Sequence, residues 1–387
     1  MIGLAAATPF ALRSQKGLAL LESFADGLPA GRLGRLEVQG LAGDPLGAFS
    51  VRRLAIRDGD GVWLEATGLD LDWSPLSLAG REVRIDSAEA RKVRILRRPV
   101  LGPPQPPRPL PVTLTVTRLS TVVELEPAFS VRKGLFRLGG GLQARRGEGG
   151  GYSARLDADS LLHAGDHLDL ELELGEDRPL KVRAEALEAG GGALAGAAGL
   201  PADRAFRLSL TADGQVEQGR VLADLRSGDL QPVKLEGGWR PEGGEVAGLV
   251  DLSASSLTRP VADRLGALLR ISGKAHGAPG QRGRYDIDLD LVTDAARAGI
   301  RGPVEFDDRR TGKGGVAVTA TASSLGRILG GVDAGPARMT GSLAGDPDEW
   351  TFKGQARVEK TGLAGYALGA LEGPVELAAA KGRLDLG

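Results

Sequence analysis

The chain has 387 residues, of which 59 are glycine and only 4% are aromatic, so a large compact core filled by aromatic side chains is not expected. Its 49 basic and 50 acidic residues are interleaved and leave a formal net charge of −1, which argues against nucleic acid as a partner. The absence of cysteine excludes disulfides, thiolate metal sites and cysteine nucleophiles.

The first nine residues form an apolar run that is much shorter than the ~20 residues needed to cross a bilayer. No Lys or Arg precedes the run, so it does not read as a signal peptide. Two interpretations stay open: the run is the end of a transmembrane helix trimmed from a longer protein, or it is a free end. Residues 10–28 follow with apolar residues three and four apart, which predicts a short amphipathic helix ended by Pro29. Its apolar positions are Leu18, Leu21, Phe24 and Leu28, with Glu22 and Asp26 elsewhere around the helix.

From residue 30 onward the hydrophobic period changes to two, which predicts strands with one apolar and one charged face. The clearest case is residues 168–174, where four leucines alternate with Asp and Glu. Such a sheet predicts a mainly β fold: an elongated, curled antiparallel sheet, groove-like or solenoid-like, with a few short helices. The inward positions that we expect to line a groove or a core are Leu69, Leu71, Leu114, Val116, Leu168, Leu170, Leu172, Ile287, Leu289 and Leu291.

Glycine-rich and Asp-Gly segments between these strands are typical of hairpin turns. They include residues 58–61, 139–141, 149–151 and 213–214. Two further segments, 258–270 and 323–329, have helical spacing and are expected to lie across a sheet edge or to plug an opening. Seven prolines between residues 99 and 111 predict an extended, exposed linker.

Residues able to carry chemistry are few. His163 and His167 stand four apart, but turn and strand patterns surround them and no third ligand follows, so a solvated loop is the favoured interpretation. Residues 312–315 superficially resemble a phosphate loop, yet the required first glycine and the Ser or Thr are missing. The four tryptophans lie in or beside strands, where sheet packing or strand-end anchoring accounts for them. Neither catalytic residues nor a cofactor or metal is therefore predicted.

Residues 30–99 carry a more specific pattern. They read GRLGRLEVQGLAG at 31–43, FSVRRLAIRD at 49–58, GVWLEA at 61–66, LDLDWSP at 69–75, and end in VRI and RP. This succession resembles the N-terminal region of the TamB family, the translocation and assembly module subunit of Gram-negative envelopes, which is grouped with AsmA-like and bridge-like lipid transfer proteins. It covers about a fifth of the chain. Family members are longer and end in a C-terminal domain that the sequence lacks, so we expect an N-terminal fragment.

The resemblance implies a periplasmic protein anchored to the inner membrane, whose apolar β-groove conveys phospholipids toward the outer membrane. It also implies an outer-membrane barrel-assembly partner for the missing C-terminal region. We accordingly expect a membrane-proximal segment at 1–29, a TamB-like β region at 30–99, a linker at 100–111 and an extended β-groove at 112–387. Two alternatives stay open: an assembly factor that templates outer-membrane strands through an exposed sheet edge, and a passive periplasmic scaffold.

Overall fold

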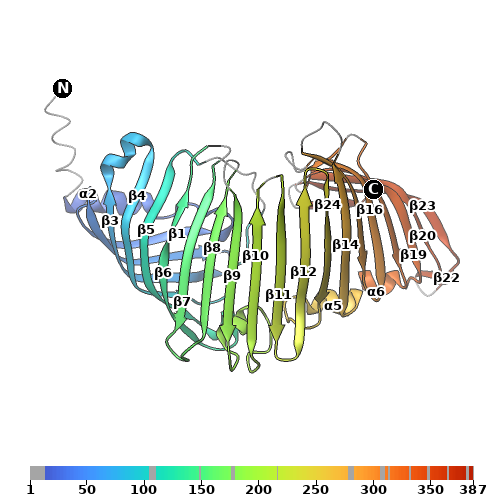
Figure 1. Cartoon of the computed structure of the whole chain (residues 1–387), viewed down its shortest axis with the longest axis horizontal. Coiled ribbons are helices and arrows are strands. Elements are labelled where there is room, and N and C mark those ends of the chain that lie inside the picture. Colours follow the sequence, from blue (N-terminus) through green and yellow to red (C-terminus); the bar gives the residue numbers. More distant parts are fainter. Residues whose placement is uncertain are drawn as a thin grey trace. The chain divides into compact units, whose positions relative to one another are not determined.

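The computed structural model of the chain describes residues 14–103, 110–147, 150–175, 179–215, 217–277, 283–305, 310–312, 314–330, 333–346, 349–363, 366–380 and 383–386. The apolar run at residues 1–9 lies outside this part. The chain divides into two compact units, residues 1–213 and 214–387. The predicted mainly β fold is confirmed, since both units are built on curled, largely antiparallel sheets with short helices (Figure 1).

Ten strands form the sheet of the first unit, and each pairs with its neighbours in chain order. They are β1 (Arg35–Gly43), β2 (Ala48–Asp58), β3 (Gly61–Ser74), β4 (Glu82–Ile95), β5 (Thr113–Leu125), β6 (Gly134–Ala144), β7 (Tyr152–Ser160), β8 (His167–Leu174), β9 (Leu180–Glu188) and β10 (Phe206–Gly214). The helical segments of this unit are α2 (Gln15–Ala25), η1 (Gly31–Leu33), η2 (Pro75–Gly80), α3 (Pro127–Ser130) and α4 (Ala193–Ala197).

The second unit continues the same hairpin-after-hairpin pattern. Its strands are β11 (Gly219–Ser227), β12 (Leu230–Arg240), β13 (Gly243–Asp251), β14 (Leu268–Gly277), β15 (Arg284–Val292), β16 (Ala296–Glu305), β17 (Arg310–Thr311), β18 (Val316–Ala322), β19 (Ala337–Gly345), β20 (Glu349–Val358), β23 (Leu371–Ala380) and β24 (Arg383–Leu386), with a separate ladder of β21 (Thr361–Leu363) and β22 (Tyr366–Leu368). Its helices α5 (Arg259–Leu265) and α6 (Leu325–Leu329) lie at the ends of strands (Figure 1).

One strand pair departs from the hairpin pattern, because β4 and β5 are parallel. A parallel pair needs a connection that returns to the starting end of the first strand. The proline-rich segment predicted as a linker makes this return. Where it leaves β4 the segment is anchored as well as exposed, since Gly102 donates its amide to the carbonyl of Arg32 and Arg97 pairs with Asp58. Pro104, Pro106, Pro107 and Pro109 lie outside the described residues.

Three predicted boundaries are wrong, one of them the turn at 213–214, since these are the last two residues of β10. Residues 139–141 were expected to turn, but they lie inside β6. A Cβ on Gly140 would stand 2.0 Å from the carbonyl oxygen of Arg155 in β7, so glycine lets the two strands approach there. The helix predicted at 258–270 ends at Leu265, because Gly266 has a φ of 105° and the chain enters β14 at Leu268.

The first helix, predicted within residues 10–28, is present as α2, and its acidic side chains bond to the sheet. The Glu22 carboxylate accepts hydrogen bonds from the amides of Gly40 and Leu41, and Asp26 accepts one from Val38. The acidic side chains therefore face the outer edge of β1; of the apolar positions, Leu18 and Leu21 are half-buried and Phe24 is 75% exposed. Carboxylates of α2 thus satisfy amides of an edge strand that have no partner strand on that side.

Candidate functional site: the apolar sheet faces

Strand register places the apolar residues of each unit on one face of its sheet. Residues directly opposite each other in a ladder point to the same side. In the first unit one such row crosses seven strands without a polar side chain, and it consists of Leu71, Ala88, Leu119, Gly140, Leu156, Leu170 and Ala184. In the second unit a row of the same kind consists of Val221, Gly237, Val246, Gly273, Leu289, Ile300, Val318, Gly341, Gly354 and Val375.

The ten residues predicted to point inward all lie on these apolar faces. Seven belong to the first unit, on β3, β5 and β8, and the other three belong to β15 of the second unit. Only Val116 among them is buried, and the rest are half-buried. All residues of the two rows except Ala184 are half-buried, so neighbouring side chains crowd these faces without sealing them. The sequence does not indicate which of these residues line a groove and which belong to a core. The structure makes this distinction for some of them.

Leu168 belongs to a core cluster at one end of the first unit. The fully buried members are Leu125, Phe136, Ala158 and Ala193, and Leu168 packs against them. Ala193 opens the short helix α4, which covers the apolar face at this end. A Cβ on Gly134 would stand 2.5 Å from the Cβ of Ala193, so the helix rests directly on β6. We call this end the α4 end of the sheet.

Charged groups hold α4 at both of its termini. The Glu188 carboxylate, 2% exposed, accepts hydrogen bonds of 2.8 Å from the amides of Leu194 and Ala195. Its pKa is raised, chiefly because burial disfavours the charged form. At the other terminus the Arg98 guanidinium donates to the carbonyls of Gly196 (3.3 Å) and Ala197 (2.7 Å). The same guanidinium lies 5.2 Å from the ring centroid of Phe129.

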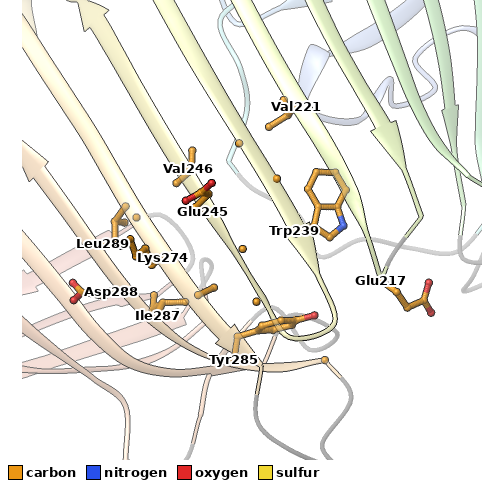
Figure 2. A pocket seen from close by; sticks show the side chains of 17 residues that line it. Glu217, Val221, Trp239, Glu245, Val246, Lys274, Tyr285, Ile287, Asp288 and Leu289 are labelled. Carbon is orange, nitrogen blue, oxygen red and sulfur yellow. The ribbon is translucent and has the colours of Figure 1, made fainter.

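A cavity of about 580 Å³ opens on the apolar face of the second unit (Figure 2). Ile287 and Leu289, two of the predicted residues, contribute to its lining, and Trp239 and Tyr285 stand beside them. The Trp239 indole donates its N–H to the carbonyl of Gln215 (3.1 Å). Leu291 lies two residues further along the same face of β15 but is not part of the lining.

The opposite face of each sheet carries paired charges. In the first unit Glu124, 5% exposed, pairs with Lys133, with Lys92 at 3.1 Å and with Arg94 at 3.5 Å. The hydrogen bond from Lys133 is the main cause that lowers the pKa of Glu124. In the second unit Arg301 pairs with Asp288 at 2.9 Å, and the pKa of Arg301 is raised by that partner. The carboxylates thus balance cations across strands, as charged sheet faces require.

The described histidines considered for chemistry make local contacts. His163 lies 3.7 Å from Asp166, and His167 contacts the carbonyl of Gly165 at 2.9 Å. Within the described ranges no three His, Asp or Glu side chains are grouped as metal ligands. Of residues 312–315, Lys313 lies outside the described part. The indoles of Trp63 and Trp73 donate to the carbonyls of Leu33 and Pro45, which is the strand-end anchoring expected from the sequence.

Three features of the site were not found from the sequence. Helix α4 is five residues of Ala, Leu and Gly, too short to show a helical period. The β4–β5 connection is predicted only as a linker, because its prolines exclude a helix or a ladder but do not indicate which strands the segment joins. The glycines beneath the cavity gave a signal that was available: Gly237 and Gly273 occupy positions of their strands where the alternation calls for an aliphatic residue.

No family model matches the chain, and neither a curated protein nor a solved structure does. Among the helices of the described residues, none has the length and apolar character needed to span a membrane. The resemblance to the TamB family therefore rests on the residues quoted for it, and function has to be argued from the sheet faces themselves.

Proposed function

We propose that the chain carries phospholipids by their acyl chains along the apolar faces of its sheets, in transport across the periplasm between the inner and outer membranes. The observation that supports this proposal is the pair of apolar rows, which cross strand after strand while remaining half-buried. Compartment, membrane anchor and the outer-membrane barrel-assembly partner belong to the proposal through the resemblance alone.

The physical reason is the cost of exposing acyl chains to water. Each methylene that leaves an apolar surface for water costs about 0.8 kcal/mol. A carrier therefore needs an unbroken apolar surface and no specific polar contacts, because an acyl chain has no hydrogen bonds to satisfy. The rows through Leu170 and Leu289 offer such a surface, and the paired charges on the reverse face keep that side in water.

The assembly-factor alternative requires an edge strand with free amides. At β1 that edge is occupied, because Glu22 and Asp26 bond to the amides of Val38, Gly40 and Leu41. No observation favours this alternative at the β1 edge. The passive-scaffold alternative predicts a protein without lipid, and mass spectrometry of organic extracts from the purified chain distinguishes it from a carrier.

A test is to replace both Leu170 and Leu172 by Asp and to measure lipid that co-purifies with the protein or photo-crosslinks to it. Two charges placed on the apolar face are expected to reduce this lipid severalfold. Leu187→Asp is the matched control, because Leu187 lies on the adjacent strand β9 opposite His167, on the charged face. Circular dichroism establishes that each variant is folded. Unchanged lipid in a folded double variant would refute carriage at these positions.

A further inference from the structure

The floor of the cavity in the second unit is made of glycine. Register places Gly237 between Val221 and Val246, and Gly273 between Val246 and Leu289. Along this part of the row, strands that contribute an aliphatic side chain therefore alternate with strands that contribute glycine. The missing side chains leave a hollow about one side chain deep, and Trp239, Tyr285 and Ile287 form its wall (Figure 2).

The space above these glycines is bounded by side-chain tips. A Cβ on Gly273 would stand 3.0 Å from Cγ1 of Val246 and 3.1 Å from Cδ1 of Leu289. A Cβ on Gly237 would stand 3.3 Å from Cγ1 of Val221. Aliphatic side chains thus close in from the neighbouring strands, so an occupant of the hollow has to be slender and lies against peptide groups and branched aliphatic carbons.

Of the four charged residues that line the cavity, three are directed to the reverse face, and the fourth, Glu217, lies outside the strands just before β11. Glu245, Lys274 and Asp288 border the cavity, but each alternates with a residue of the apolar face, so its side chain points to the reverse face. The indole N–H of Trp239 is already bonded to the carbonyl of Gln215. An occupant therefore gains little from hydrogen bonds in the floor and most from apolar contact.

We infer that this cavity is a discrete binding site for a single acyl chain, a station within the proposed path; this inference rests on the proposed function. Its volume of about 580 Å³ lies within the range of roughly 300–1,000 Å³ usual for small-ligand sites. A slender hollow floored by glycine and walled by Trp239 and Tyr285 selects an unbranched hydrocarbon chain over a rigid fused-ring ligand.

The test uses Trp239 as the reporter. Fatty acids brominated on the chain quench a nearby indole, and the Trp239→Phe variant identifies the Trp239 share of the quenching. Affinity is expected to rise about fourfold per added methylene until the hollow is filled, and then to level off. Free palmitate is expected to relieve the quenching and cholesterol is not. Equal displacement by cholesterol, or quenching unchanged in Trp239→Phe, would overturn the assignment.

A pair of glycine variants locates the site. Gly273→Leu fills the hollow, where only the tips of Val246 and Leu289 have to shift, and is expected to weaken fatty-acid binding at least tenfold. Gly238→Leu is the control: the backbone of Gly238 borders the cavity, but its Cβ would point to the reverse face and meet nothing nearer than 3.5 Å. Binding that survives Gly273→Leu overturns the station.

Phospholipid extracted with the protein separates this inference from the proposed function. Lipid carriage without quenching that depends on Gly273 would overturn the station and leave carriage standing. Quenching that depends on Gly273, in a protein that carries no phospholipid, would overturn the proposed carriage while leaving an acyl-chain site.

Discussion

Replacing Arg98 by Ala is expected to loosen α4 without unfolding the sheet. The variant loses one strong hydrogen bond to Ala197, a longer one to Gly196, and the contact with the Phe129 ring. A charged hydrogen bond contributes roughly 1.5–3 kcal/mol when buried and a cation–π contact about 0.5–1 kcal/mol. Since Arg98 is half-buried, we take the low ends, which gives about 2 kcal/mol.

The assay is hydrogen exchange of peptides that cover the amides of Gly196, Ala198 and Leu200, which are bonded within and just after α4. A local loss of about 2 kcal/mol corresponds to exchange roughly 30-fold faster. Arg98→Lys keeps the charge but loses the planar guanidinium fork. Its exchange is therefore expected to be faster than in the unaltered chain and slower than in Arg98→Ala. Peptides from β2 and β3 serve as internal controls. Unchanged exchange in α4, or equal acceleration throughout the unit, would refute the reasoning.

Two further outcomes follow from named contacts. The double variant Glu22→Ala with Asp26→Ala leaves the amides of Val38, Gly40 and Leu41 without partners, so light scattering is expected to show concentration-dependent self-association; a strictly monomeric variant would contradict edge protection by α2. Because the pKa of Glu124 is lowered by folding, its stabilising contribution is present above its ordinary value of 4.5 and is lost as the pH falls below it. The urea midpoint of Glu124→Gln should therefore change less on acidification than that of the unaltered chain, and parallel curves would contradict this.

The sequence was sufficient for the strands and their faces because alternation is a local signal. The leucines of residues 168–174 report their own side of the sheet, and register bears this out across both neighbours of β8. Alternation alone does not indicate which residues of the apolar face are packed into a core. Leu168 is packed by the cluster under α4, whereas Leu289 lines an open cavity, and that difference depends on an element more than twenty residues away from Leu168.

Sequence-based prediction was incomplete where residues distant in the sequence determine the local structure. The spacing in residues 10–28 predicts the helix, but it does not indicate that Glu22 and Asp26 bond to amides of β1. The glycines at 139–141 were read as a turn because their strand partners could not be seen. Gly237 and Gly273 each interrupt the alternation of their own strand, but only the register shows that both lie in one row, with Val246 between them.

The parallel pair β4–β5 has a consequence for every later connection in the first unit. In an uninterrupted succession of hairpins, strand direction reverses at each step, so odd-numbered and even-numbered connections occur at opposite ends. Strand direction does not reverse between β4 and β5, so every later connection falls at the opposite end from the one it would have in an uninterrupted succession of hairpins. The β5–β6 connection with α3, the loop before His167 and the β9–β10 connection with α4 therefore all fall at the end where β4 finishes.

That is also the end where Arg98 leaves the sheet. Deleting the crossover and joining β4 to β5 by a tight turn would send α3 and α4 to the far end of the strands and leave Arg98 with nothing to hold. The direction of the β4–β5 connection thus determines at which end of the strands α3 and α4 close the apolar face of this unit.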